Sequence, residues 1–440
     1  MLAILGHRTY RHLFLAQVVA LIGTGLATVA LGLLAYDLAG ADAGLVLGTA
    51  LAIKMIAYVT VAPIASAFAE RLPRRTMLVT LDLVRAAVAL LLPFVSEIWH
   101  VYVLIFVLQA ASAAFTPTFQ ATIPDVLPDE AEYTRALSLS RLAYDMESVV
   151  SPMLAAALLT VISFHVLFAG TVVGFLISAA LVMSVTLPSP KSTERRGIYD
   201  RTTRGVRMYL ATPRLRGLLA LNLAVSAASS MVIVNTVVLV QAAFGLDERA
   251  TALALASYGA GSMAAALSLP RVLDRRPDRV VMLAGGGLLV AGLTVGTFVG
   301  SYALLLPLWF VLGFGNSTTQ TPTGRLLRRS APAADRPAIF AAQFALSHAC
   351  WLITYPLAGW IGAKFGFGVA FAAFAIIAAA ATFLATKLWP GSDEDLVEHT
   401  HNDLPQSHPH LRAGVQTGGG PQHAHASTDD ELHANWPERP

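Results

Sequence analysis

The sequence predicts an all-α integral membrane protein whose twelve transmembrane helices form two pseudo-symmetric six-helix bundles. Composition is the first reason, because 55% of the 440 residues are apolar and 13% are charged, whereas a soluble domain carries about 25% charged residues. The second reason is a series of twelve apolar stretches, each near the roughly 20 residues that cross a bilayer as a helix. An internal repeat is the third. Helices are expected because lipid cannot satisfy exposed backbone groups.

The apolar stretches divide the chain into two halves, a linker and a tail. We expect an N-terminal bundle over residues 1–187, a basic cytoplasmic linker over 188–216, a C-terminal bundle over 217–390 and a disordered His-rich tail over 391–440. The predicted spans are 12–36, 44–69, 76–96, 99–122, 138–160, 166–187, 217–244, 251–271, 280–300, 303–324, 338–360 and 366–389.

The placement of basic residues predicts the orientation. If the connections are counted alternately as outside and inside, the outside loops hold only Arg249 and Lys364 of the 30 Lys and Arg residues. Cytoplasmic loops are enriched in Lys and Arg, so both termini are expected to face the cytoplasm across a bacterial inner membrane. The single cysteine, Cys350, excludes an internal disulfide.

The second half of the chain repeats the first. The run Glu-Arg-Leu-Pro-Arg-Arg at 70–75 returns as Asp-Arg-Arg-Pro-Asp-Arg at 274–279, an offset of 204 (274 − 70). Thr-Pro-Thr at 116–118 returns at 321–323, and Pro152 is echoed by Pro356. Parallel halves of this kind place a substrate path between them, near the bilayer midplane.

Residues 1–390 resemble a transporter of the major facilitator superfamily. The run at 70–75 is similar to that superfamily's acidic-Arg-x-x-Arg-Arg loop, with Glu70 for the usual Asp and Pro73 near the usual Gly. Ser151 and Pro152 are similar to its fifth-helix antiporter motif, with small residues replacing glycines. The resemblance implies that the loop controls gating between the halves. The gating residues that it implies are Glu70, Arg71, Arg74, Arg75, Asp274 and Arg275.

The tail is rich in histidine. Seven of the twelve histidines lie after residue 390, six of them in His-x-His pairs. Imidazole suits nickel, zinc and copper, and a His-rich tract indicates metal binding, although a merely solvated tail is the alternative. A transporter body with such a tail resembles bacterial nickel-resistance exporters of the NreB type. The expected metal ligands are His399, His401, His408, His410, His423, His425 and His433.

Ionisable and polar side chains inside the predicted spans are candidates for the transport path, because charges in a membrane are costly and tend to be functional or paired. Asp145 and Glu147 lie about 200° apart on one helix, and Arg141 is placed to pair with Asp145. Asp82 and Arg85, one turn apart, are expected to form a structural pair. Lys54 could pair with an acid such as Asp145. The path candidates are Asp145, Glu147, His348, Cys350, Lys54 and Asn316.

The favoured function is export of a divalent transition-metal cation, nickel or possibly cobalt, by proton antiport, which would confer metal resistance. No Gly-x4-Gly-Lys-Ser/Thr loop for ATP occurs in the sequence, so an ion gradient is the expected energy source. We expect no enzymatic activity, no cofactor apart from carried or tail-bound Ni2+, no nucleic acid partner, and a monomer in the lipid bilayer. The alternatives are export of an organic drug or siderophore, with the tail incidental, and a membrane metal sensor that does not transport.

Overall fold

The structure is a computed structural model that describes residues 2–39, 43–69, 72–188, 198–391, 397–400, 415–416 and 422–425. Almost all of the described chain before residue 390 is helical. The helices of the first half are η1 (Leu2–Gly6), α1 (Arg8–Ala39), α2 (Ala43–Ala69), α3 (Arg74–Leu91), η3 (Leu92–Phe94), α4 (Ile98–Val126), α5 (Glu130–Leu159) and α6 (Phe164–Met183).

The second half repeats this order after an additional helix in the linker. Its helices are α7 (Ile198–Ala211), α8 (Pro213–Val237), the π-helical turn η4 (Val238–Ala243), α9 (Glu248–Leu273), α10 (Asp278–Gly296), α11 (Tyr302–Gln320), α12 (Thr323–Arg329), α13 (Arg336–Phe365) and α14 (Phe367–Leu388). The sequence predicted neither α7 as a separate helix nor the short α12.

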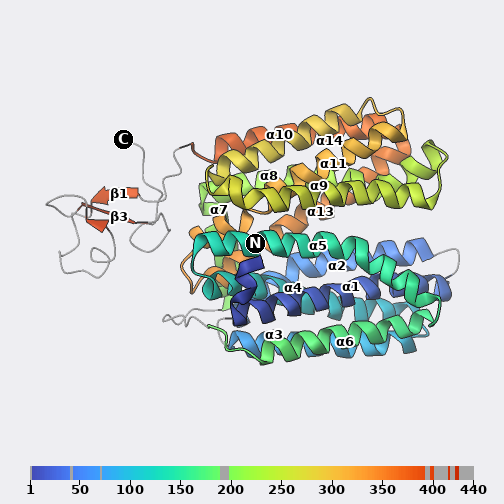
Figure 1. Cartoon of the computed structure of the whole chain (residues 1–440), viewed down its shortest axis with the longest axis horizontal. Helices are drawn as coiled ribbons and strands as arrows, with labels where there is room; N and C mark the ends of the chain where they lie inside the picture. The colour runs from blue at the N-terminus through green and yellow to red at the C-terminus, as the bar shows by residue number, and fades with distance from the viewer. Residues whose placement is uncertain are drawn as a thin grey trace.

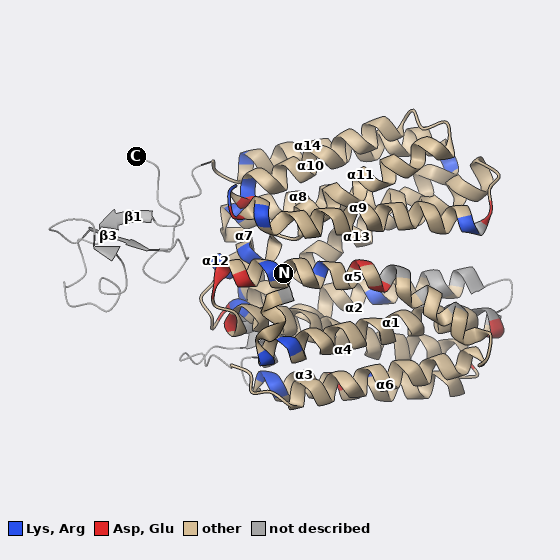
Figure 2. Cartoon of the chain, in the orientation of Figure 1, with Lys and Arg blue, Asp and Glu red and all other residues tan. Residues whose placement is uncertain are grey.

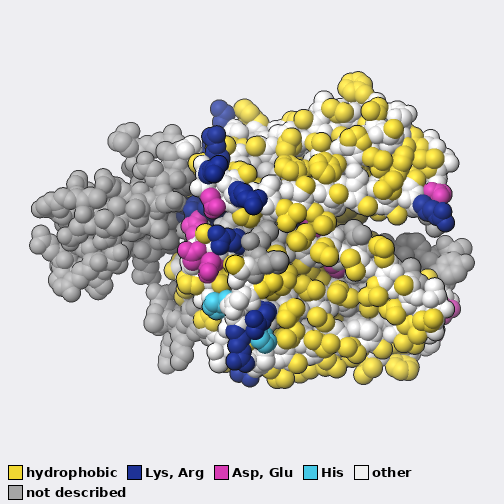
Figure 3. Space-filling view, viewed as in Figure 1, with side chains coloured by type: hydrophobic (Ala, Val, Ile, Leu, Met, Phe, Trp, Pro, Cys, Tyr) yellow, Lys and Arg dark blue, Asp and Glu magenta, His cyan; other side chains and the backbone are white. Residues whose placement is uncertain are grey.

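Each of the twelve predicted spans coincides with one long helix, and the predicted fold class is confirmed. Within the described residues, nine helices are long and apolar enough to cross a membrane by composition alone. The helix α5, which carries six charged side chains, is not among them. Large apolar side chains such as Phe94, Phe298 and Ile376 lie exposed on the outside of the bundles, where Figure 3 shows a broad apolar surface. Lipid is the solvent that this surface suits.

The two halves pack side by side, and equivalent helices pack in equivalent ways. Figure 1 shows α1–α6 in one layer and α8–α14 in the other. Inside the first half α1 packs on α6, and α2 on α4; inside the second half α8 packs on α14, and α9 on α11. The halves meet mainly where α2 contacts α13 and where α5 contacts α9. Those two contacts are related by the repeat.

Close packing inside the second half depends on glycine. A Cβ added at Gly313 of α11 would lie 1.9 Å from the Tyr258 carbonyl oxygen of α9, and one at Gly261 of α9 would lie 1.9 Å from the Phe310 carbonyl oxygen. Such small residues let helix backbones approach closely in membranes. The two helices are therefore held at a separation that no larger residue at these positions permits.

Charged residues gather at one end of the molecule. Figure 2 shows Lys and Arg concentrated near α7, α12 and the start of α3, α10 and α13, with few at the opposite end. We call this the basic end. The prediction that it faces the cytoplasm rests on the sequence and stays a prediction.

The tail contributes three short strands among its described residues, which the sequence did not predict. They are β1 (Val397–Thr400), β2 (Val415–Gln416) and β3 (Gln422–His425), in the order β1-β3-β2. The pairing of β1 with β3 is antiparallel and sets the backbone of His399 opposite that of His423. The predicted ligands His401, His408, His410 and His433 lie outside the described residues.

Candidate functional site

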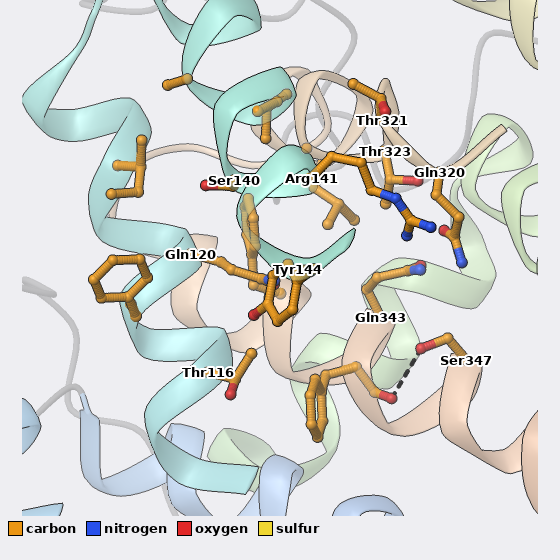
Figure 4. Close-up of a pocket in the computed structure, with 18 of the residues that line it drawn as sticks. Thr116, Gln120, Ser140, Arg141, Tyr144, Gln320, Thr321, Thr323, Gln343 and Ser347 are labelled. Atoms are coloured by element: carbon orange, nitrogen blue, oxygen red, sulfur yellow. Dashed lines mark hydrogen bonds between the residues drawn. The ribbon is translucent and has the colours of Figure 1, made fainter. Parts of the chain in front are cut away.

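A cavity of about 390 Å³ lies between the two halves. Its walls come from α1, α2, α4 and α5 on one side and from α11, α12, α13 and the turn between α11 and α12 on the other. The helix α5 begins at Glu130, at the basic end of the molecule. Because a helix rises 1.5 Å per residue, Arg141 lies about 16 Å along α5 from that residue. Figure 4 shows Arg141 extending from α5 toward Gln320 and Gln343 of the other half.

Hydroxyl and amide groups dominate the polar lining of the cavity. Arg141 is the only charged side chain among the described residues that line it, and none of them is acidic. Such a lining offers hydrogen bonds to a polar molecule and one positive charge. The polar lining residues are Gln17, Tyr58, Thr116, Gln120, Tyr133, Ser140, Arg141, Tyr144, Gln320, Thr321, Thr323, Gln343, Ser347 and His348.

Arg141 connects the halves at the level of the cavity. Its Nε and Nη2 atoms donate hydrogen bonds of 3.0 and 2.9 Å to the Ser262 hydroxyl of α9. The same Nη2 atom lies 3.2 Å from Asp145 Oδ1, which confirms the predicted pair one helical turn apart. Ser262 is fully buried and Asp145 is 7% exposed.

An aromatic cluster forms the side of the cavity where α2 meets α13. The Tyr58 ring lies 4.8 Å from Phe344 and 4.7 Å from His348, measured between ring centroids. Nδ1 of His348 lies 2.7 Å from the Phe344 carbonyl oxygen. Only an N–H can bind a carbonyl oxygen, so Nδ1 carries a proton and donates to its own helix. His348 thus lies in the cavity wall with its ring packed against Tyr58 and Phe344.

A network of ion pairs closes the basic end between the halves. Asp125, at the end of α4, pairs with Arg74 of its own half and with Arg336 of the other half. Glu130, at the start of α5, pairs with both Arg325 and Arg329 of α12. Acidic groups of the first half therefore hold basic groups of the second half, and we call this network the gate.

Further contacts strengthen the gate. Arg328 donates to the Pro128 carbonyl oxygen, and its guanidinium lies 5.5 Å from the centroid of the Tyr133 ring. Burial lowers the pKa of the Arg328 guanidinium, and the nearby Arg336 acts in the same direction. Behind α12, Asp278 lies 3.3 Å from Arg325 and 3.4 Å from Arg329. Charged side chains of both halves thus share one interface.

The gate has a charge-inverted repeat. Adding the offset of 204 to Arg74 gives Asp278, and adding it to Asp125 gives Arg329. Arg74 pairs with Asp125 in the first half, and Asp278 pairs with Arg329 in the second. The two halves thus build the same ion pair with opposite signs. Because the signs differ, the facing surfaces attract each other instead of repelling.

The opposite end of the interface is more open. Figure 3 shows the surface hollowed between the two halves at the end away from the basic residues. The ion pairs that join the halves within the described parts of the chain lie at the basic end. The structure therefore represents a state closed at the basic end.

The loop signature identified part of the gate. Arg74 is buried within it, whereas Arg75, Asp274 and Arg275 are exposed. Asp274 and Arg275 instead line a second cavity of about 370 Å³ at the basic end. Glu70 and Arg71 lie outside the described residues. The sequence missed Asp125, Glu130, Asp278, Arg325, Arg329 and Arg336.

The offset could have found some of these residues, because Asp278 occupies the repeat position of Arg74 and Arg329 that of Asp125. No sequence signal marked the partners across the interface. Glu130 and Arg325 are 195 residues apart, and their meeting depends on how the halves dock.

The structure separates the predicted path residues. Among them, only His348 lines the cavity. The Glu147 carboxylate packs against α1, where a Cβ added at Gly25 would lie 2.8 Å from its Oε1 atom. Lys54 interacts electrostatically with Glu147, so the acid near Lys54 is Glu147 and not Asp145. The Lys54 ammonium lies 5.6 Å from the centroid of the Tyr58 ring.

The remaining candidates lie away from the cavity. Cys350 donates a hydrogen bond of 3.5 Å to the Leu346 carbonyl oxygen, and Asn316 is 6% exposed. No group of three or more His, Cys, Asp and Glu side chains with metal-binding geometry occurs within the described part of the chain. The predicted pair of Asp82 and Arg85 is confirmed, and Arg85 lies between the rings of Phe115 and Phe175.

The paired bundles, the shared cavity and the gate define a secondary transporter, and sequence comparison gives its family. Residues 13–232 and 218–416 match the Major Facilitator Superfamily. The chain belongs to that superfamily and is a multi-pass membrane protein.

Curated relatives are distant. The chain is 25% identical over 413 residues to the uncharacterized MFS-type transporter YvqJ of Bacillus subtilis, covering 89% of this chain and 95% of the relative. It is 27% identical over 124 residues to the uncharacterized MFS-type transporter YfiS of the same organism, and the match spans 30% of that protein. It is also 26% identical over 152 residues to macrolide efflux protein A of Enterococcus faecalis, covering 32% of this chain and 47% of that protein.

Solved structures share the fold. The human organic anion transporter MFSD10 superposes with a TM-score of 0.75 at 12% identity, covering 86% of this chain and 99% of the other. A bacterial homologue of the iron transporter ferroportin, in an outward-facing state, superposes with a TM-score of 0.71 at 15% identity, covering 86% and 98%. At these identities the likeness concerns the fold.

Proposed function

We propose that this protein exports a polar organic molecule by alternating access, with the basic end toward the cytoplasm. The observation that carries this proposal is the cavity lining. Hydroxyls, amides, aromatic rings and one guanidinium suit an organic molecule better than a bare divalent cation, because such cations select carboxylate, thiolate or clustered imidazole ligands. The partial match to macrolide efflux protein A supports the same class of substrate.

Transport requires that the gate opens and closes. In the state described here the pairs between Glu130 and Arg325 and between Asp125 and Arg336 hold the basic end shut. Breaking these pairs would open the cavity to the cytoplasm, where the substrate binds. Re-forming them would close the basic end, so that the cavity with its bound substrate opens to the other side of the membrane. Halves that rock around a central site are the general mechanism of such folds.

Protons are the proposed coupling ion, and Glu147 is the proposed carrier. Asp145 is held by Arg141, which is itself fixed to Ser262. Glu147 lies half-buried beside α1, with Lys54 as its electrostatic partner. A carboxylate that can exchange its lysine partner for a proton suits coupling better than one paired with an arginine that is itself bonded to the other half.

Nickel export is the second candidate, and the tail favours it. The register of β1 and β3 sets the backbone of His399 opposite that of His423, so one histidine from each of two His-x-His pairs lies in neighbouring strands. Imidazole ligands suit nickel. In this candidate the tail would collect cytosolic metal, and the intramembrane residues Asp145, Glu147 and His348 would carry it.

One experiment separates the two candidates. Cells with and without the protein are loaded with rhodamine 123 or with carboxyfluorescein, and dye retention and nickel accumulation are measured. Organic export predicts faster loss of at least one dye and unchanged nickel. Ser347→Trp should abolish dye loss because it fills the cavity, whereas Ser184→Trp, on the exposed end of α6, should not. Lower nickel with unchanged dyes would overturn organic export and favour the second candidate.

A further inference from the structure

We propose that the exported molecule carries an acidic group that binds Arg141, and that Ser262 displaces this group when the basic end closes. The inference rests on the proposed organic export and adds the substrate class and a mechanism of release. Arg141 is then the residue that selects anions. Ser262 competes with the bound acidic group for Arg141 when the basic end closes, and we call Ser262 the latch.

The first argument is charge. Among the cavity-lining residues that the structure describes, Arg141 alone is charged, and no acid lines the cavity with it. Asp145 contacts the guanidinium from outside the cavity, at 3.2 Å from Nη2. Asp145 offsets part of the positive charge, so an acidic molecule is drawn by the guanidinium N–H donors, and no acid among the described lining residues repels it. An acidic organic molecule is therefore the substrate that this cavity favours.

The second argument is hydrogen-bonding geometry. Two guanidinium nitrogens of Arg141 donate to one neutral hydroxyl oxygen, that of Ser262. A carboxylate or phosphate accepts such a pair of donors on two separate oxygens, and charge-assisted bonds are roughly twice as strong as neutral ones. An anion in the cavity would thus replace Ser262 as the preferred partner of Arg141.

The third argument is position. Ser262 belongs to α9 of the second half, and α5 and α9 form one of the two main contacts between the halves. The bond from Arg141 to Ser262 exists only while α5 and α9 are close. A substrate bound to Arg141 therefore favours the state in which the helices separate, since a ligand shifts the equilibrium toward the state that it binds better.

Directionality follows from this competition. When the basic end is open, Arg141 is available to an anion from the cytoplasm. Closure brings Ser262 against Arg141, and the Ser262 hydroxyl then occupies two N–H donors of Arg141 that the substrate had used. The affinity of the cavity for the substrate is therefore lower when the cavity faces the outer side. Export requires this sequence of high and low affinity.

The first test measures substrate charge. Everted membrane vesicles that expose the basic end are energised and supplied with carboxyfluorescein, an anion, or rhodamine 123, a cation on the same ring system. We expect Arg141→Gln to slow carboxyfluorescein uptake roughly 10- to 100-fold and to change rhodamine 123 uptake less than twofold. Arg141→Lys should keep part of the activity. Arg135→Gln is the matched control, because Arg135 lies on the same helix outside the cavity lining.

Two results would count against the inference. If Arg141→Gln vesicles carry carboxyfluorescein at the wild-type rate, or if the wild type carries only rhodamine 123, Arg141 does not select anions and organic export still stands. If the wild type carries neither dye, the proposed function fails together with the inference.

The second test measures the latch. In a Cys350→Ala background, Leu327→Cys places a thiol in the cavity wall near the gate, and its labelling by a biotin maleimide from the basic end reports opening. We expect carboxyfluorescein to raise the labelling rate, and Ser262→Ala to raise it without dye. Ser257→Ala, on the same helix but bonded to the Leu306 carbonyl oxygen within its own half, is the control. Labelling unchanged by Ser262→Ala and by carboxyfluorescein would overturn the latch.

Discussion

At the scale of single residues, the described charged side chains inside the membrane fall into two groups, those held in a short ion pair and those that interact with a charged partner only electrostatically. Asp82 and Arg85 form a closed unit in the first bundle, where Ser178 donates to the second carboxylate oxygen of Asp82 at 2.8 Å. Glu147 interacts electrostatically with Lys54 and with Tyr144. The first arrangement is suited to stability, and the second is suited to a change of protonation.

The pair of Asp82 and Arg85 predicts a strong effect on stability. Asp82→Asn should destabilise the protein by about 3–5 kcal/mol, because it leaves Arg85 buried without its counter-charge. Replacing both residues, by Asn and Met, should restore most of that loss. Thermal unfolding of the purified protein in detergent provides the measurement. A single variant as stable as the wild type would show that Arg85 finds another partner.

Glu147 predicts a loss of coupling without a loss of binding. Glu147→Gln should abolish dye uptake driven by a pH gradient in everted vesicles, because the amide takes up no proton. Exchange of labelled for unlabelled dye should persist, since the cavity is intact. Glu132→Gln, near the start of the same helix, serves as control. Persistent gradient-driven uptake in the Glu147 variant would exclude it as the proton carrier.

At the scale of elements, the helices are positioned by small residues as much as by large ones. α9 and α11 approach at Gly261 and Gly313, and each helix presses a glycine against a carbonyl of the other. α9 also carries Ser262, next to Gly261, so the close packing of α9 on α11 fixes the position of the latch. The close packing of α9 on α11 at these glycines therefore determines both the rigidity of the second bundle and the position of Ser262.

Enlarging one of these glycines should therefore destabilise the second bundle. Gly313→Ala places a methyl group 1.9 Å from the Tyr258 carbonyl oxygen and should destabilise the protein by about 1–3 kcal/mol through overpacking. Gly287→Ala is the matched control, because nothing lies within 4 Å of its added Cβ. Unfolding temperatures of the two variants provide the comparison, and equal temperatures would contradict the packing argument.

At the scale of the whole molecule, the two halves are similar in helix order and opposite in charge at the gate. The first half presents Asp125 and Glu130 to the interface, and the second presents Arg325, Arg329 and Arg336. Identical halves would place like charges together, and such juxtaposition costs several kcal/mol. Inversion of the repeated pair is what allows a duplicated fold to close.

Charge reversal tests this account. Arg74→Asp combined with Asp125→Arg keeps an ion pair inside the first half but sets a second guanidinium against that of Arg336. We expect dye transport to fall at least about tenfold, because like charges across an interface cost several kcal/mol. Adding Arg336→Asp should restore it. Transport rates in vesicles decide the outcome. Failure of the triple variant to recover, with normal amounts in the membrane, would show that the gate does not act through charge.

Removal of the tail separates the body from its histidines. Deleting residues 391–440 should leave dye export unchanged, because the cavity and gate end before that segment. If nickel is a substrate, the deletion should weaken nickel tolerance without abolishing it, since only the collecting ligands are lost. Growth at graded nickel concentrations gives the measurement. Loss of all dye export, with the truncated protein still in the membrane, would contradict an accessory role for the tail.

The sequence by itself determined the membrane class, the twelve helices and the repeat, because hydropathy and helical span length are local properties of the chain. It also determined Arg141 with Asp145 and Asp82 with Arg85, since partners one turn apart follow from helix geometry. Only the tertiary structure decided the gate and the cavity. Glu130 with Arg325 and Arg141 with Ser262 join residues more than 100 positions apart. Such contacts depend on how two lipid-embedded halves dock, and no local pattern encodes that.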